Sequence, residues 1–280
     1  MTETATQETS LRVWLVELFA FGNLAFLALD IYLAHSINDF AHPAEWIPFY
    51  FSLVVPPLML PGLIRRECHR GVGLKVGLLV GAGSVIVGIM GMVLHLSSNF
   101  FQAQTLKALV YTAPFAAPLA YSGVGFLLIL NRMEPARSRA WGPWVVFLAL
   151  CGFVGNFALS LCDHAQNGFF IATEWIPVIA SAFAVSFLVV ATLRQTDRLL
   201  LIACVVVMFF QILVGLLGFG LHLFADLRGP ATSFAANIIY GAPPFAPLLF
   251  VNLAILALIG LWEMLASERD CPVETVTLPQ

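Results

Sequence analysis

The stretch KVGLLVGAGSVIVGIMGMVLHL, residues 75–96, decides the fold class. Between Lys75 and His95 it carries no charged side chain. A helix needs about 20 apolar residues to cross the roughly 30 Å hydrocarbon core of a bilayer, and this stretch is long enough. A helix that is apolar on every side is buried in a large core or in a membrane, because it has no face to show to water. The stretch therefore predicts a transmembrane helix.

The whole chain has the composition of a membrane protein. Of its 280 residues, 60% are hydrophobic and 10% are charged, and its mean hydropathy is +0.92. Soluble domains carry about 25% charged residues. The formal net charge is −3, and no phosphate loop, Rossmann glycine cluster or HExxH sequence is present. We therefore expect lipid as the main partner, and neither nucleic acid nor ATP.

Eight apolar stretches follow one another along the chain, joined by short connections that hold polar and turn-forming residues. They are Leu11–Leu33, Trp46–Ile64, Lys75–Leu96, Ala108–Leu130, Trp144–Leu161, Trp175–Leu193, Leu199–Phe224 and Ile238–Trp262. The sequence therefore predicts an all-α integral membrane protein with eight transmembrane helices. Glu17 and Glu263 lie near the inner ends of the first and last of these, where they could pair with arginines if the two helices are adjacent.

Basic residues orient the predicted spans. All but two of the 13 Lys and Arg fall on one side, and only Lys107 and Arg228 fall on the other. Because cytoplasmic loops are enriched in Lys and Arg, both termini are expected in the cytoplasm. The six tryptophans fall at predicted span ends, as in an aromatic belt. Short loops of this kind fit a bacterial cytoplasmic (inner) membrane, where the chain could also bind partner subunits of a membrane complex.

Four sequence signals recur in the same order, at offsets of 133, 129, 127 and 129 residues. They are Gly22-Asn23 and Asp30, repeated as Gly155-Asn156 and Asp163; Glu45-Trp46-Ile47-Pro48, repeated as Glu174-Trp175-Ile176-Pro177; Gly88, Gly91 and His95, repeated as Gly215, Gly218 and His222; and Tyr111, Pro114 and Pro118, repeated as Tyr240, Pro243 and Pro247. The pattern predicts two tandem four-helix repeats of parallel topology, residues 1–134 and 135–265, followed by a disordered tail at 266–280. Parallel repeats are related by an axis along the membrane normal.

Titratable side chains gather at the outer ends of the predicted spans in both repeats, and we expect them to meet in one pocket. The candidate metal ligands are Asp30, Glu45, His95, Asp163, Glu174 and His222, with His42 from the first outer loop. Imidazole and carboxylate together suit transition metals, with iron or copper favoured here. On the other interpretation, these carboxylates cap helix ends and meet water at the headgroups. On the alignment of Gly-Asn and Asp, His35 has no counterpart, because Gly168 occupies its position.

A second interpretation of the same region is haem. Gly88 and Gly91 lie seven and four residues before His95, so all three share one helix face, and the same holds for Gly215, Gly218 and His222. Missing side chains beside a histidine leave room for a macrocycle, and the two histidines could ligate one iron. Alternatively, small residues four apart serve close helix packing in lipid.

The last repeated signal holds tyrosines and prolines. Tyr111 and Tyr240 could donate hydrogen bonds to a bound anion or take part in redox chemistry, or they could be interface anchors. The prolines that follow them remove helix hydrogen bonds, so the helices should bend or break there. Broken helices in matching positions of two halves indicate a binding site.

Two functions of different classes remain open on the sequence. The first is a membrane protein with a pseudo-symmetric His/carboxylate site at its outer face that binds a metal or haem, as in a redox membrane subunit. The second is a transporter or permease that moves a cation or a proton-coupled solute. A membrane scaffold without a cofactor is the third possibility, and the sequence leaves open whether the chain is an enzyme.

Overall fold

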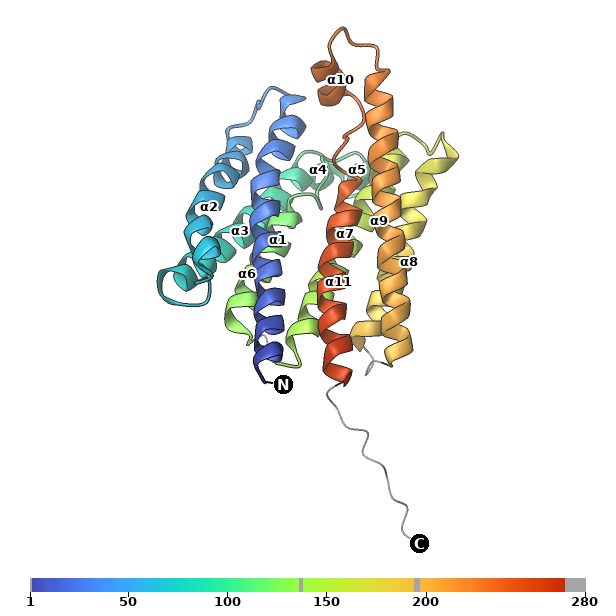
Figure 1. The fold of residues 1–280 in the computed structure, drawn as a ribbon. Coiled ribbons are helices and arrows are strands. Elements are labelled where there is room, and N and C mark those ends of the chain that lie inside the picture. The colour runs from blue at the N-terminus through green and yellow to red at the C-terminus, as the bar shows by residue number, and fades with distance from the viewer. Residues whose placement is uncertain (1, 136–137, 194–196, 270–280) are drawn as a thin grey trace.

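The computed structural model describes residues 2–135, 138–193 and 197–269, and all regular elements within these ranges are helical (Figure 1). In chain order they are α1 (Thr2–Ser36), η1 (Pro43–Glu45), α2 (Trp46–Arg65), α3 (Gly71–Ser97), α4 (Phe100–Ala103), α5 (Leu106–Val110), α6 (Leu119–Met133), α7 (Trp141–Gln166), η2 (Ala172–Glu174), α8 (Trp175–Leu193), α9 (Arg198–Leu227), α10 (Phe234–Tyr240) and α11 (Leu248–Arg269). Residues 266–269 thus continue α11, and the rest of the predicted tail lies outside the described residues.

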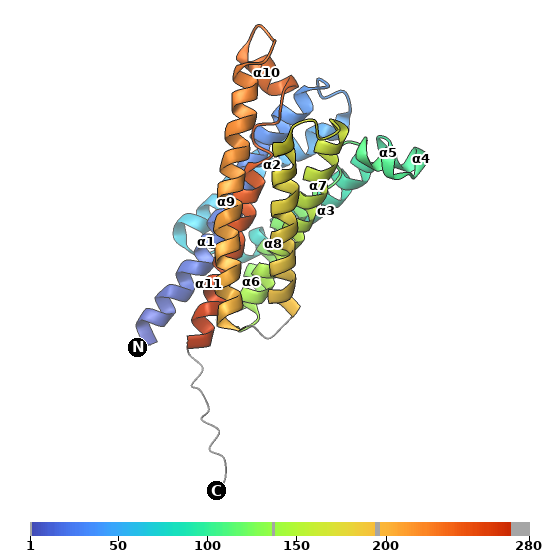
Figure 2. The ribbon, with the colours of Figure 1, turned by 90° about the vertical axis from the view of Figure 1, so that its right-hand side faces the viewer.

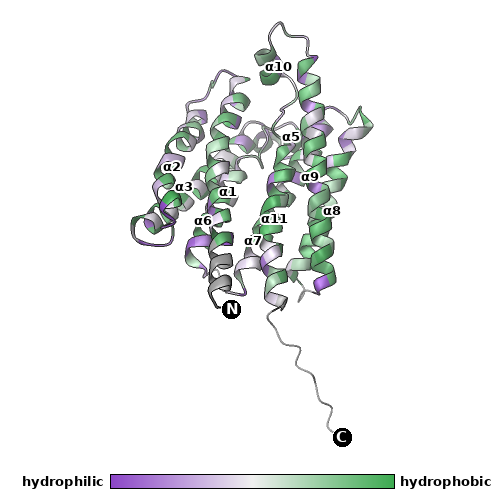
Figure 3. Ribbon diagram, in the orientation of Figure 1, coloured by the Kyte–Doolittle hydropathy of each residue, from purple (hydrophilic) through white to green (hydrophobic). Residues whose placement is uncertain are grey.

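Seven of these helices are long and apolar enough to cross a membrane, namely α1, α2, α3, α7, α8, α9 and α11. Large apolar side chains cover their outer surfaces, and Leu79, Val206 and Leu213 are among the most exposed. The hydropathy colouring in Figure 3 shows that α8, α9 and α11 are apolar over most of their length. The prediction of an all-α integral membrane protein is confirmed at this level.

The predicted continuous span Ala108–Leu130 is wrong in its boundaries. Helix α5 ends at Val110 and α6 begins only at Leu119, so α6 is a short apolar helix of 15 residues. The predicted span Ile238–Trp262 is interrupted in the same way between Tyr240 and Leu248. Prolines occupy both interruptions, and a proline cannot donate the helical hydrogen bond. The expected helix breaks are therefore confirmed.

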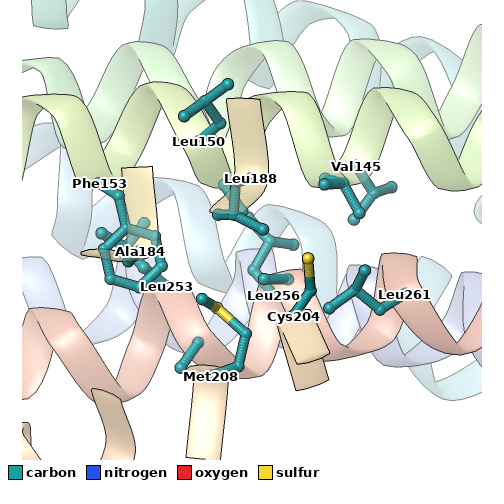
Figure 4. Close-up of a cluster of buried hydrophobic side chains, with 14 of the residues drawn as sticks. Val145, Leu150, Phe153, Ala184, Leu188, Cys204, Met208, Leu253, Leu256 and Leu261 are labelled. Carbon is teal, nitrogen blue, oxygen red and sulfur yellow. The ribbon is translucent and has the colours of Figure 1, made fainter. Parts of the chain in front are cut away.

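The helices pack as two groups, which we call the first half (α1–α6) and the second half (α7–α11). Within the first half α1 packs on α2 and α6, and α3 packs on α6. Within the second half α7 packs on α8 and α11, and α9 packs on α11. The halves meet where α1 contacts α11 and where α6 contacts α7. The larger apolar core lies in the second half, where residues such as Phe153, Leu188 and Met208 interdigitate (Figure 4).

Both views of the ribbon place the start of α1 and the end of α11 at the same end of the molecule (Figures 1 and 2). The α1–α2 turn, the α7–α8 turn and α10 lie at the opposite end. We refer to these as the inner and outer ends, following the sequence-based orientation. At the inner end Arg12 of α1 forms an ion pair with Glu263 of α11, as the sequence suggested.

Candidate functional site

The turn between α1 and α2 has the same backbone conformation as the turn between α7 and α8. Asp39 and Phe40 have φ of 54° and 51°, and Gly168 and Phe169 have φ of 73° and 51°. In each turn the second residue is a phenylalanine that stacks on a tryptophan: Phe40 on Trp46 with ring centroids 4.1 Å apart, and Phe169 on Trp175 at 4.0 Å. Each turn thereby fixes the end of one long helix against the start of the next.

In the first half this turn brings His35 and Glu45 together beside His95. The Nδ1 of His35 lies 3.6 Å from a carboxylate oxygen of Glu45, with the two side chains 20% and 16% exposed. Asn38 donates a hydrogen bond of 2.9 Å to the other carboxylate oxygen. The rings of His35 and His95 lie edge to face with centroids 6.1 Å apart. We call His35, Glu45 and His95 the first outer cluster.

The second half repeats this arrangement with His164, Glu174 and His222, which we call the second outer cluster. His164 lies close enough to Glu174 and His222 to interact with both electrostatically. Its ring also contacts Phe169, as the ring of His35 contacts Phe40.

His95 and His222 each donate to a carbonyl freed by a helix break. The Nδ1 of His95 lies 2.9 Å from the carbonyl oxygen of Pro114, and the Nδ1 of His222 lies 2.8 Å from that of Pro243. A carbonyl oxygen can only accept, so the proton sits on Nδ1 in both rings. The Nε2 of each neutral ring is therefore an acceptor.

The glycines next to these histidines lie against proline and not against open space. A Cβ on Gly91 would lie 2.7 Å from the Cβ of Pro118, and a Cβ on Gly218 would lie 2.7 Å from the Cβ of Pro247. Gly88 and Gly215 meet the same two helices one turn earlier, near Ser122 and Val251. The four glycines serve close helix packing, the alternative interpretation of their spacing. The haem prediction loses the room on which it depended, and it stays a prediction.

Each outer cluster has more hydrogen-bond acceptors than donors. One carboxylate oxygen of Glu45 and one of Glu174 are buried without any hydrogen-bond partner. A buried carboxylate oxygen without a partner is costly, since the charge has lost its water. With the Nε2 acceptors of His95 and His222 nearby, each cluster requires a proton or another cation to balance its acceptors.

The sequence alignment missed His35 and mispaired its loop. Counted back from Glu-Trp-Ile-Pro, the order is His, four residues, Phe, four residues, Glu in both halves, so His164 matches His35 at an offset of 129. The expectation that Gly168 occupies the position of His35 is wrong: Gly168 corresponds to Asp39. His42 lies outside the cluster, and its Nδ1 accepts a hydrogen bond from the backbone N–H of Ala44.

Asp30 and Asp163 are not equivalent in depth. Asp30 lies five residues before His35, whereas Asp163 lies one residue before His164, which puts them on the same helix face one turn apart. Asp30 is near the hydroxyl of Tyr121, which donates to the carbonyl oxygen of Pro48 at 2.9 Å and also bonds to Ser52. The first half therefore holds a polar group beneath its outer cluster.

The remaining predicted site residues lie apart from both clusters. Tyr111 and Tyr240 are 54% and 63% exposed, at the ends of α5 and α10. Every ring contact and ion pair found for the cluster histidines stays within its own half, so the predicted common pocket receives no support from these contacts. Across the described ranges, no group of three or more His, Cys, Asp or Glu side chains is arranged to hold a metal ion.

Comparison with known proteins assigns no relative to this chain: no protein family, curated protein or solved structure matches it significantly.

Proposed function

We propose that the chain is a proton-binding membrane protein that carries one His–Glu–His cluster at the outer end of each half, as part of proton-coupled transport. We further propose that the halves are two four-helix repeats and that α5 with α6 forms an eighth, broken span. The like turns, the paired Gly–Pro contacts and the two His–carbonyl bonds support the repeat.

The observation that carries the proposal is the excess of acceptors around His35 and His164. In the first outer cluster, His35 faces an unpartnered oxygen of Glu45 on one side and the ring of His95 on the other. An imidazole satisfies two acceptors at once only when both of its nitrogens carry protons. The arrangement therefore favours the imidazolium form of His35, and the second outer cluster favours that of His164.

Such clusters make the outer face sensitive to pH. Histidine is the side chain whose charge ordinarily changes between about pH 5 and 8. When the proton leaves, a carboxylate and two neutral rings remain without a donor among them, and the turn that holds them loses part of its support. Proton release would thus loosen the α1–α2 and α7–α8 turns, which is the kind of coupling that a proton-linked transporter requires.

The test is a count of the protons taken up per molecule between pH 8 and pH 5, by indicator titration of the protein in lipid nanodiscs. Glu45→Gln and Glu174→Gln keep the shape of the side chain and remove the charge that holds the imidazolium. Each should lower proton uptake by about one proton, since one histidine no longer charges in that range. Asp39→Asn is the matched control, because it removes an exposed carboxylate from the same turn. Equal uptake in Glu45→Gln, Glu174→Gln and Asp39→Asn would overturn the proposal.

A transition metal is the second candidate for the same clusters. It is favoured by the bonds from Nδ1 of His95 and His222 to backbone carbonyls, because a metal-ligating histidine commonly holds its other ring nitrogen in this way. Equilibrium dialysis of the purified protein with Cu²⁺ or Zn²⁺ tests it, with a visible spectrum to reveal haem. Binding of one ion per cluster that is lost in His95→Gln and His222→Gln would favour the metal over the proton.

A further inference from the structure

A pocket opens at the inner end of the first half, between the end of α2 and the start of α3. Its volume is about 160 Å³. One wall is apolar, from Leu58 and Met59 of α2 and Val72 and Val76 of α3. The other carries the guanidinium groups of Arg65 and Arg132, together with Glu67 and Cys68. The pocket thus joins an apolar surface to a cationic one.

Arg132 reaches this pocket because Gly77 of α3 leaves it room. A Cβ on Gly77 would overlap the guanidinium group. One terminal nitrogen of Arg132 pairs with Glu17, whose carboxylate also accepts a bond of 2.6 Å from Asn131. The Nε of Arg132 is buried and has no hydrogen-bond partner, although the side chain is only 3% exposed. A buried guanidinium N–H without an acceptor is costly, so an acceptor supplied from outside would stabilise it.

The surroundings of the pocket are cationic. Arg65 stands at its mouth and is exposed, and Arg66 and Arg70 belong to the turn that follows α2. Glu67 is the acidic residue in the lining, while Glu17 is already paired with Arg132. Burial lowers the pKa of His69, so this residue is neutral at physiological pH. The charge that is left over favours an anion.

Cys68 does not turn the pocket into a reaction site. Burial, with a further contribution from Glu17, raises the pKa of its thiol to about 11. The nucleophilic thiolate is therefore scarce at neutral pH. The pocket is built to bind and not to react.

We propose that this pocket binds the headgroup of an anionic phospholipid from the inner leaflet. Its phosphate would accept from the Nε of Arg132 and from Arg65, since guanidinium groups are preferred phosphate donors. A pocket of this volume is roughly ten times what one water occupies, which suits a phosphate and its glycerol carbons. The acyl chains would lie outside it along Leu58 and Val72, whose side chains are exposed on the lipid-facing surface. Basic pockets between transmembrane helices on the cytoplasmic side commonly bind such lipids.

The test is native mass spectrometry of the full chain, released from phosphatidylcholine nanodiscs that contain increasing fractions of phosphatidylglycerol. We expect one phosphatidylglycerol to be retained by the wild type. Arg65→Gln should weaken its retention by about fivefold to tenfold, as expected for one lost arginine near a lipid phosphate. Arg198→Gln is the matched control, because it removes an exposed charge from the inner end of the second half.

A second pair of variants tests the cavity without changing any charge. Gly62 lines the pocket, and a Cβ there would have its nearest contacts at 3.7 Å and 3.8 Å, so Gly62→Val should fold while it fills part of the space. It should also weaken phosphatidylglycerol retention, whereas Gly22→Val on open surface should not. Equal retention in Arg65→Gln and Arg198→Gln would overturn the proposal. Displacement of the lipid by millimolar inorganic phosphate would also overturn it and would make the pocket a site for the free anion.

Discussion

The two halves of the molecule are alike at their outer ends and different at their inner ends. Outside, the turns, the stacked Phe–Trp pairs and the His–carbonyl bonds agree closely in the two halves. Inside, the first half buries the Glu17–Arg132 pair with Asn131, and the second half has Leu150, Leu261 and Gly260 at the positions 133, 129 and 129 residues further on. The likeness marks what both halves share, the outer clusters. The difference marks what only the first half has, a polar inner end beside an arginine-lined pocket.

The largest effect should come from breaking the ion pair that only the first half carries. Glu17→Leu leaves Arg132 as an uncompensated buried charge, and the loss should be about 3–5 kcal/mol in the free energy of unfolding. Glu17→Leu combined with Arg132→Leu should recover most of this loss, because it copies Leu150 and Leu261 of the second half. Unfolding in sodium dodecyl sulfate followed by circular dichroism measures both. A double variant as unstable as the single one would mean that the inner end needs its charges for packing.

The glycines of the outer ends should respond equally in the two halves. In Gly91→Ala and Gly218→Ala the new methyl group meets a proline Cβ at 2.7 Å, so each should cost about 1–3 kcal/mol. Gly22→Ala and Gly155→Ala are the controls, since a Cβ there has no neighbour within 4 Å. These should instead be neutral or stabilise by up to about 1 kcal/mol, as expected for alanine in a helix. The same unfolding assay compares the four variants, and unlike losses at Gly91 and Gly218 would argue against equivalent packing.

The polar group beneath the first outer cluster should have a smaller effect. Tyr121→Phe removes the bonds to Pro48 and Ser52 and should cost about 1 kcal/mol. Phe250 occupies the corresponding position of the second half, 129 residues further on, and is buried. Phe250→Tyr should therefore gain nothing and lose about 1 kcal/mol or more, because its hydroxyl has no matching serine bond. A gain in unfolding free energy from Phe250→Tyr would show that Ser181 can turn to meet it.

The smallest effect should come from the turn residues that differ between the halves. Asp39 and Gly168 both have positive φ, a conformation that costs an ordinary residue energy and glycine little. Gly168→Asp should destabilise by less than about 1 kcal/mol, and Asp39→Gly should change stability by a similar amount in the opposite direction. Thermal unfolding in detergent can resolve the sign. If both substitutions destabilise, Asp39 contributes a contact that glycine cannot replace.

Some parts of the fold follow from the sequence alone. The apolar stretches predict membrane-spanning helices because a backbone in lipid must satisfy its hydrogen bonds within each helix. Pro114, Pro118, Pro243 and Pro247 predict the two helix breaks, because proline removes the hydrogen bond at its own position. The pairing of Glu263 with an arginine follows from their places at adjacent inner ends.

Other features could be read only from the tertiary structure. The repeated Gly-Asn and Asp aligned α1 with α7 one turn away from the register in which their outer ends match, and a shift of four residues keeps a side chain on the same helix face. For that reason the sequence alignment left His35 without a partner.

The sequence by itself determined that this protein is helical, that it lies in a membrane and where its helices break. These are local properties, set by the length of apolar runs and by the backbone chemistry of proline. Only the tertiary structure decided that His35 and His164 are partners of Glu45 and Glu174, and that the glycines beside His95 and His222 face proline. Contacts of this kind depend on the register and distance between helices, which the turns and the packing set and no single stretch of sequence records.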